Sequence, residues 1–255
     1  MPFHNFIHDL KIKMKLLTLL RTLPIIVTLC FIQIDTTCAA GVGINATRVI
    51  FPQDSQSVPV TLRNTTEKEE YLVQVYLTKI AKGASQDQTL DVLPPMFYLA
   101  SKQQRDVRLV EGAQVAGLPK DRESIFYFHA RAIAASEKNG ELQKTSMKGD
   151  VKIALESVIK VFYRPKNLPL TVEQAHSSLL FEETANGINV VNPSPYYITL
   201  SSLSVGGQAV ALNPDLNNTM IAPFASINYS LSVKKGKKVW AVINDLGGRS
   251  EYSRP

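Results

Sequence analysis

Cysteine is almost absent from this chain, and both of its cysteines, Cys30 and Cys38, precede residue 41. The rest of the chain therefore has no disulfide and no thiolate, so its stability must come from a hydrophobic core. Histidine is scarce as well, because only His129 and His176 follow residue 40. Two histidines without cysteine do not supply the usual zinc ligands. We expect neither a metal nor a cofactor.

The motifs of common enzyme classes are also missing, since the chain contains no HExxH, GxSxG or P-loop pattern. His129 lies in a strand-like segment, residues 126–133, and His176 lies in a polar linker. Single histidines are more often structural than catalytic. Aspartates and glutamates are scattered, which leaves a hydrolase with paired carboxylates open but singles out no pair. We therefore expect that the protein is not an enzyme.

No apolar run reaches the roughly 20 residues of a transmembrane helix. Residues 1–40 have the layout of a secretory signal peptide, with lysines, then apolar stretches, then small residues. We expect cleavage after Ala40 or after Ala39, and a start at Met1 or Met14. The formal net charge of +6 falls to +4 without this segment, with 24 basic and 20 acidic residues. No dense basic cluster interleaved with aromatics appears, so nucleic acid is not an expected partner.

Short alternating segments separated by Gly, Pro and Asn predict strands throughout the chain after residue 40. The first set of expected strands covers residues 43–51, 57–64, 71–80, 96–99, 106–110 and 124–133. The second set covers 179–182, 187–192, 196–205, 226–233 and 238–244. This spacing is typical of antiparallel sandwiches. We predict an all-β chain of two β-sandwich domains, 41–163 and 170–255, joined by a hinge at 164–169 after a signal peptide at 1–40.

The stretch from residue 151 to 165 has the most informative pattern. Val151, Ile153 and Leu155 alternate with polar or small residues, and the stretch then becomes apolar apart from Lys160 before it ends at Pro165. A polar run at 136–150 precedes it. Two interpretations stay open: the strand belongs to an ordinary sandwich core, or another chain adds a strand beside it.

Several charged residues stand among apolar neighbours. A charge in such a place must be paired, must bind something or must face water. Arg48 in NATRVIF and Lys160 in VIKVFY fit any of these three cases. Glu123, Arg164 and Asp245 share the property, and they could form a pair or a triad between the domains.

Nine segments, in order, carry a resemblance to a known family. They are TRVIF (47–51), YLVQV (71–75), LPPMFYL (93–99), QQRDVRL (103–109), LPKDRESIFYF (118–128), IKVFYRP (159–165), NPSPYYITL (192–200), MIAPFA (220–225) and INDLGG (243–248). Together they are specific, and they cover essentially the whole chain after residue 40. The chain resembles the periplasmic pilus chaperones of the chaperone–usher pathway.

The resemblance implies two immunoglobulin-like domains arranged in an L with a cleft between them. It also implies a function: a periplasmic chaperone that binds, folds and caps pilus subunits by donor-strand complementation and delivers them to an outer-membrane usher. By position, the family's donor-strand plugs match Val151, Ile153 and Leu155. Its anchors for the subunit's C-terminal carboxylate match Arg48 and Lys160, and its structural interdomain charge network matches Glu123, Arg164 and Asp245.

The chain departs from the family pattern in places. Ala134-Ala135 stands where many members have prolines, and the loop before the donor strand is several residues longer than in short-loop members. Since longer-loop members usually carry a disulfide there, we favour the short-loop class. Lys160 lies five residues after Leu155, so alternation puts the two on opposite faces unless a bulge lies between Glu156 and Ile159.

Two further expectations concern partners. The free protein could self-associate through its donor strand, because an exposed strand edge is a template for pairing. The alternative function is a two-domain immunoglobulin-like structural or adhesive protein of the periplasm without chaperone activity.

Overall fold

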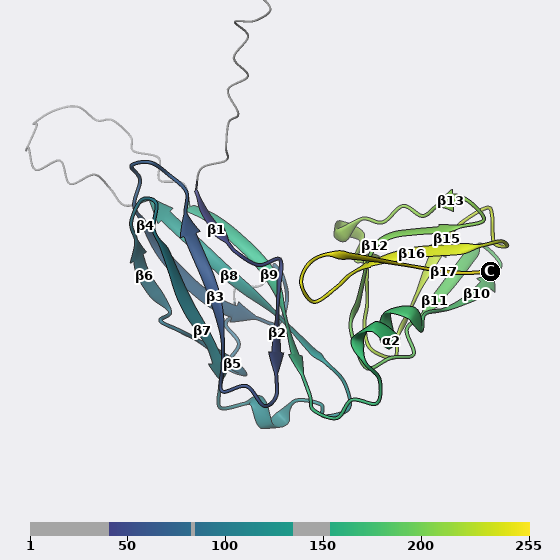
Figure 1. The fold of residues 1–255 in the computed structure, drawn as a ribbon, viewed down its shortest axis with the longest axis horizontal. Coiled ribbons are helices and arrows are strands. Elements are labelled where there is room, and N and C mark those ends of the chain that lie inside the picture. The colour runs from purple at the N-terminus through teal and green to yellow at the C-terminus, as the bar shows by residue number, and fades with distance from the viewer. Residues whose placement is uncertain (1–40, 83–84, 135–153) are drawn as a thin grey trace, which may run out of the picture. The chain divides into compact units, whose positions relative to one another are not determined.

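A computed structural model of the chain describes residues 41–82, 85–134 and 154–255 (Figure 1). The predicted signal peptide, the polar loop at 136–150 and the plugs Val151 and Ile153 lie outside the described residues. In the part that is described, no helix has the length and apolar character needed to cross a membrane.

The first half of the chain forms two facing sheets. One sheet has the strand order β1 (Val42–Ile44), β3 (Ser57–Asn64), β7 (Gln104–Glu111), β5 (Leu90–Leu93). The other has the order β2 (Arg48–Pro52), β9 (Ala154–Arg164), β8 (Ser124–Ala134), β4 (Tyr71–Thr78), β6 (Met96–Leu99). Between them lies one apolar core, which includes Phe51, Leu62, Phe126, Phe128 and Val161. The strands alternate buried and outward residues as sheets with one buried face do.

The second half forms another pair of sheets (Figure 1). Trp240 belongs to the apolar core of this half. One sheet has the order β10 (Leu180–Thr184), β11 (Gly187–Val191), β15 (Ser226–Ser230). The other has the order β13 (Gln208–Ala209), β12 (Ile198–Val205), β16 (Lys238–Ile243), β17 (Arg249–Arg254), with β14 (Met220–Ile221) also on β12. Short 3₁₀ turns occur at Val115–Gly117 and Pro214–Leu216. The all-β class predicted from the sequence is confirmed.

The expected polar linker around His176 is instead a short helix, α2 (Val172–Ser177). Thr171 and Gln174 form a capping box at its start, in which each side chain bonds the other's backbone N–H. His176 is buried, and its carbonyl oxygen accepts a 3.0 Å hydrogen bond from Trp240 Nε1. The helix therefore closes one end of the second core.

The expected single strand at residues 43–51 is two strands that belong to different sheets. β1 pairs antiparallel with β3, and β2 pairs parallel with β9. The core-facing positions change from Val42 and Ile44 in β1 to Val49 and Phe51 in β2. The prediction was wrong because periodicity over so short a segment does not reveal where the chain passes from one sheet to the other. The switch brings Arg48 directly beside Lys160 in the register of β2 and β9.

Strand β9 is paired unequally along its two edges. Its pairing with β8 runs without interruption from Ala154↔Ile133 to Tyr163↔Ser124. Its pairing with β2 covers only Lys160 to Arg164. Among the residues that the structure describes, no strand pairs with the second edge of residues 154–159. This segment is an open strand edge.

Candidate functional site

The two faces of β9 have different surroundings. Val161 and Tyr163 are buried in the first core, whereas Lys160, Phe162 and Arg164 project from the opposite face. The register with β8 is unbroken, so no bulge separates Glu156 from Ile159. Leu155 has the same parity as the core residues and is 52% exposed. Leu155 and Lys160 therefore lie on opposite faces of one strand, and Val151 and Ile153 are outside the described residues.

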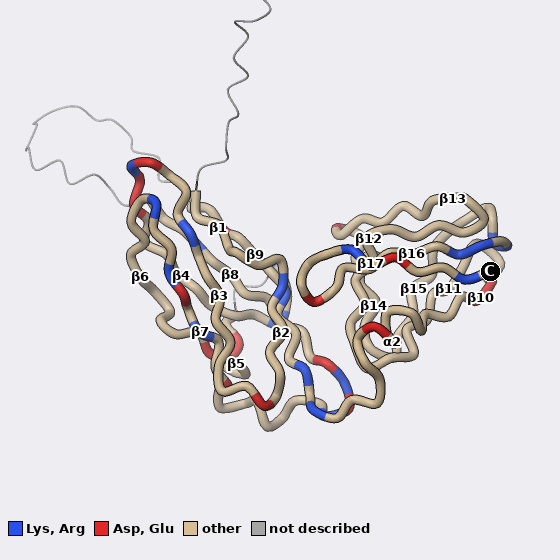
Figure 2. The backbone as a smooth tube through the Cα atoms, viewed as in Figure 1, with Lys and Arg blue, Asp and Glu red and all other residues tan. Residues whose placement is uncertain are grey.

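Arg48 and Lys160 are adjacent cations on the same face of the sheet, where β2 meets β9. Figure 2 shows basic residues side by side on these strands. Arg48 Nη1 donates a 2.9 Å hydrogen bond to the carbonyl oxygen of Ile243, and its guanidinium carbon lies 5.7 Å from the ring centroid of Phe162. Arg48 Nε is buried and has no hydrogen-bond partner in the described part of the chain.

The charges of this pair are not compensated nearby. Within the described ranges, no carboxylate oxygen lies within 4.0 Å of a nitrogen of Arg48 or Lys160. Burial lowers the pKa of Lys160, and the positive charge of Arg48 lowers it further. Burial also lowers the pKa of Arg48, although Asp245 and Glu123 act in the opposite direction. Two partly desolvated cations side by side favour binding of an anion.

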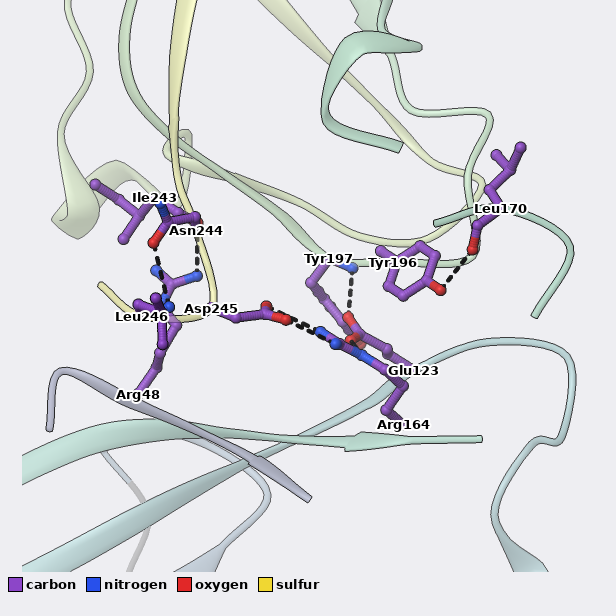
Figure 3. A network of polar contacts seen from close by, with 10 residues as sticks. All are labelled: Arg48, Glu123, Arg164, Leu170, Tyr196, Tyr197, Ile243, Asn244, Asp245 and Leu246. Carbon is purple, nitrogen blue, oxygen red and sulfur yellow. Dashed lines mark hydrogen bonds and ion pairs between the residues drawn. The ribbon is translucent and has the colours of Figure 1, made fainter. Parts of the chain in front are cut away.

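Arg164, four residues after Lys160, has a different environment (Figure 3). Its Nε donates to Glu123 Oε1 at 2.8 Å, and its two terminal nitrogens donate to the carboxylate of Asp245 at 2.7 and 3.0 Å. Glu123 is 3% exposed, and its other oxygen accepts from the backbone N–H of Tyr197 at 2.9 Å. Burial alone would lower the pKa of Arg164, but Asp245 and Glu123 together raise it. The structure thus brings together the three charges singled out in the sequence.

A polar cluster that the sequence did not indicate lies further along the Lys160 face of the sheet. The Tyr76 hydroxyl donates a 2.6 Å hydrogen bond to Glu156 Oε1, and Arg131 lies 3.1 Å from the same oxygen. The buried ring of His129 stacks on Tyr76 with centroids 4.7 Å apart, and its Nε2 lies 2.8 Å from Thr78 Oγ1. Burial lowers the pKa of His129. Since the cluster depends on the register of three strands, no local motif could have revealed it.

In the described residues, no group of three or more His, Cys, Asp or Glu side chains is arranged to hold a metal ion. What the residues of the β9 region offer is an open strand edge next to a pair of cations.

Comparison with protein families gives two matches that cover most of the chain. Residues 41–169 match the N-terminal domain model of the pili and flagellar-assembly chaperones, PapD N-terminal domain. Residues 174–254 match the C-terminal domain model of the pili assembly chaperone PapD.

Curated relatives agree with the family models. The chaperone protein FocC of Escherichia coli is 32% identical over 214 residues, which is 83% of this chain and 88% of the relative. The chaperone protein FimC of Escherichia coli K12 is 32% identical over 209 residues, which is 82% of this chain and 81% of the relative.

Solved structures agree as well. The periplasmic chaperone SfaE superposes with a TM-score of 0.66 at 29% identity, covering 84% of this chain and 98% of that one. The Salmonella enterica SafB chaperone, solved in complex with the SafA pilin, gives a TM-score of 0.69 at 28% identity, with 86% and 97% covered. The chain belongs to the family of periplasmic pilus-assembly chaperones.

Proposed function

We propose that this chaperone binds pilus subunits by offering the open edge of β9 as a strand and by holding the subunit's C-terminal carboxylate between Arg48 and Lys160. The observation that carries the proposal is the position of these cations at the point where the open edge ends and β2 begins. Binding free energy alone drives the process, so the protein works without catalysis or a cofactor. The SafB–SafA complex supports a pilin as the partner.

The proposed anchor sets the direction of the bound strand. The incoming strand lies along residues 154–159 of β9, in line with β2, which begins at Arg48. If its last residue lies at Arg48 and Lys160, its chain runs toward Lys160, as β9 does. The bound strand is therefore parallel to β9, and the segment 154–159 offers about 20 Å of edge.

The apolar plugs give the bound subunit its missing core residues. Val151, Ile153 and Leu155 share one parity, and Leu155 is the one that the structure describes, exposed at the end of the first core. An incomplete sandwich that lacks one strand would cover these side chains, as in other cases of strand addition. Anchoring the carboxylate fixes the register, because a slip of one residue would turn every side chain to the other face.

The remaining assignments complete the proposal. The domains span 41–163 and 170–255 with a hinge at 164–169, and Glu123, Arg164 and Asp245 hold this hinge in place as a structural network. The loaded chaperone passes its subunit to an outer-membrane usher. In the free protein, the open edge of β9 is the surface through which two copies would self-associate.

The test uses Arg48→Ala and Lys160→Ala, each co-expressed in the periplasm with a pilin subunit from the same genome. Each charge-assisted contact contributes about 1.5–3 kcal/mol, so each variant should recover at least about tenfold less complex. Lys237→Ala, at an exposed turn lysine, is the matched control and should behave as wild type. Undiminished recovery of the complex with both Arg48→Ala and Lys160→Ala would exclude the carboxylate anchor. Recovery of no complex by the wild-type protein would favour the structural or adhesive alternative.

A further inference from the structure

Tyr127 belongs to the same transverse row of the sheet as the two cations. Lys160 is the register partner of Arg48 on β2 and of Tyr127 on β8. Phe126 and Phe128, the neighbours of Tyr127, are buried in the first core. Tyr127 therefore projects from the opposite face of the sheet, the face that also carries Arg48 and Lys160.

The hydroxyl of Tyr127 makes no hydrogen bond to any described residue, although its side chain is half-buried. Most other tyrosines that are buried or half-buried do have a partner for the hydroxyl: Tyr71, Tyr76, Tyr163, Tyr196 and Tyr229. A buried tyrosine hydroxyl usually finds a partner. The Tyr127 hydroxyl is thus an available donor in a partly desolvated place, and burial raises its pKa, which keeps it protonated.

The surroundings make such a donor effective. Directly opposed residues on antiparallel strands have Cβ atoms about 4.5–5.5 Å apart, so the side chains of Tyr127 and Lys160 start as neighbours. The Phe162 ring lies beside the site, with the Arg48 guanidinium carbon 5.7 Å and the Tyr197 ring centroid 5.7 Å from its own centroid. These aromatic rings shield part of the site from water, which strengthens polar contacts made there.

We infer that Tyr127 is a third ligand of the bound C-terminal carboxylate: its hydroxyl donates a hydrogen bond to one carboxylate oxygen, while Arg48 and Lys160 supply the positive charge. A carboxylate offers about four lone-pair sites, enough for all three donors. The inference rests on the proposed function, because it names a further contact at the same site. Through this contact, the hydroxyl of Tyr127 favours partner chains whose free C-terminal carboxylate lies at this site.

The experiment compares Tyr127→Phe with wild type for two peptide probes. Each probe has about ten residues of alternating valine and threonine, a typical strand length, and a polyethylene glycol tag at its N-terminus. One probe ends in a free carboxylate and the other in a carboxamide. Tyr98→Phe, at an exposed tyrosine of β6 with the same chemistry, is the matched control.

Tyr127→Phe should weaken binding of the free-carboxylate probe about tenfold or more, because a hydrogen bond to a charged group is lost. Its affinity for the carboxamide probe should fall clearly less, because the carboxamide oxygen accepts only a neutral hydrogen bond, which contributes about 0.5–1.5 kcal/mol. If wild type prefers the carboxylate and Tyr127→Phe retains that preference in full, the assignment of Tyr127 is wrong while the cation site stands. If wild type does not distinguish the two probes, the carboxylate site itself is wrong, and the role of Tyr127 with it.

Discussion

Two basic sites lie on one face of β9, and they differ in what surrounds the charge. Arg164 is held by two carboxylates, with three hydrogen bonds between 2.7 and 3.0 Å, and its pKa is raised. Arg48 and Lys160 have no carboxylate partner among the described residues, and their pKa values are lowered. The first site is electrostatically complete, and the second is not.

In the proposed function, this difference separates a structural charge from a binding charge. Glu123 belongs to the first sandwich and Asp245 lies in the turn between β16 and β17 of the second, so Arg164 ties the two together at one point (Figure 3). Arg48 also reaches the second sandwich, but through the carbonyl oxygen of Ile243, a neutral partner. In the proposed function, this neutral contact leaves the charge of Arg48 available for an anion from another chain.

The largest expected effect comes from removing a carboxylate partner of Arg164. Glu123→Ala should lower the free energy of unfolding by about 3 kcal/mol, because it leaves Arg164 partly unpaired and an N–H of Tyr197 without its acceptor. Urea unfolding measures this change. Asp121→Ala is the control, since Asp121 is an exposed acid paired with Arg122, and it should leave the midpoint unchanged. A midpoint for Glu123→Ala equal to that of wild type would show that the network contributes nothing to stability.

Much of this contrast could be predicted from the sequence. A charged residue inside an apolar strand has few physical options, so Arg48, Lys160, Glu123, Arg164 and Asp245 stood out without coordinates. The alternation of the strands predicted the all-β class for the same reason, because one face of each strand must be buried.

The rest depended on pairing, which leaves no local signal. β17 (Arg249–Arg254) is polar along its length, and only its pairing with β16 makes it a strand. The acceptor of Arg48 is a backbone carbonyl, and every residue has one. Tyr127 is an ordinary aromatic residue in a strand until the register places it opposite Lys160. The sequence therefore singled out these charges and the grouping of Glu123, Arg164 and Asp245, but not the neighbours that strand pairing gives to Arg48 and Lys160.

Removing the charge of Lys160 should have a smaller effect on the free energy of unfolding, and one of opposite sign. Lys160→Met should raise the free energy of unfolding of the free protein by about 1 kcal/mol, because it removes a partly buried cation beside Arg48 and keeps an apolar stem of similar length. Urea unfolding again supplies the measurement, with Lys237→Met as the control at an exposed turn. A loss of stability would mean that Lys160 has a compensating partner in the free protein, and that the contrast with Arg164 is false.

The smallest expected effect is the pH dependence of the stability difference between Lys160→Met and wild type. The folded pKa of Lys160 lies below its ordinary value of 10.5, so between the two pKa values the unfolded chain binds the proton that the folded chain has released. Wild type should therefore become more stable relative to Lys160→Met as pH rises toward 10.5. This relative stability of wild type should rise steadily between neutral pH and pH 9.5, because the unfolded chain keeps its proton over this range.

The groups that face Lys160 do not obscure this titration. Tyr127 lies opposite Lys160 on β8, and burial raises its pKa, so it stays neutral below pH 10. Arg48 lies beside Lys160 on β2 and stays charged over the same range. Urea unfolding of both variants at matched pH values gives the difference directly, and common titrations elsewhere cancel. A difference that stays constant with pH would mean that Lys160 is as well solvated in the folded protein as in the unfolded one, and the site would then lack the desolvation that favours binding of a carboxylate.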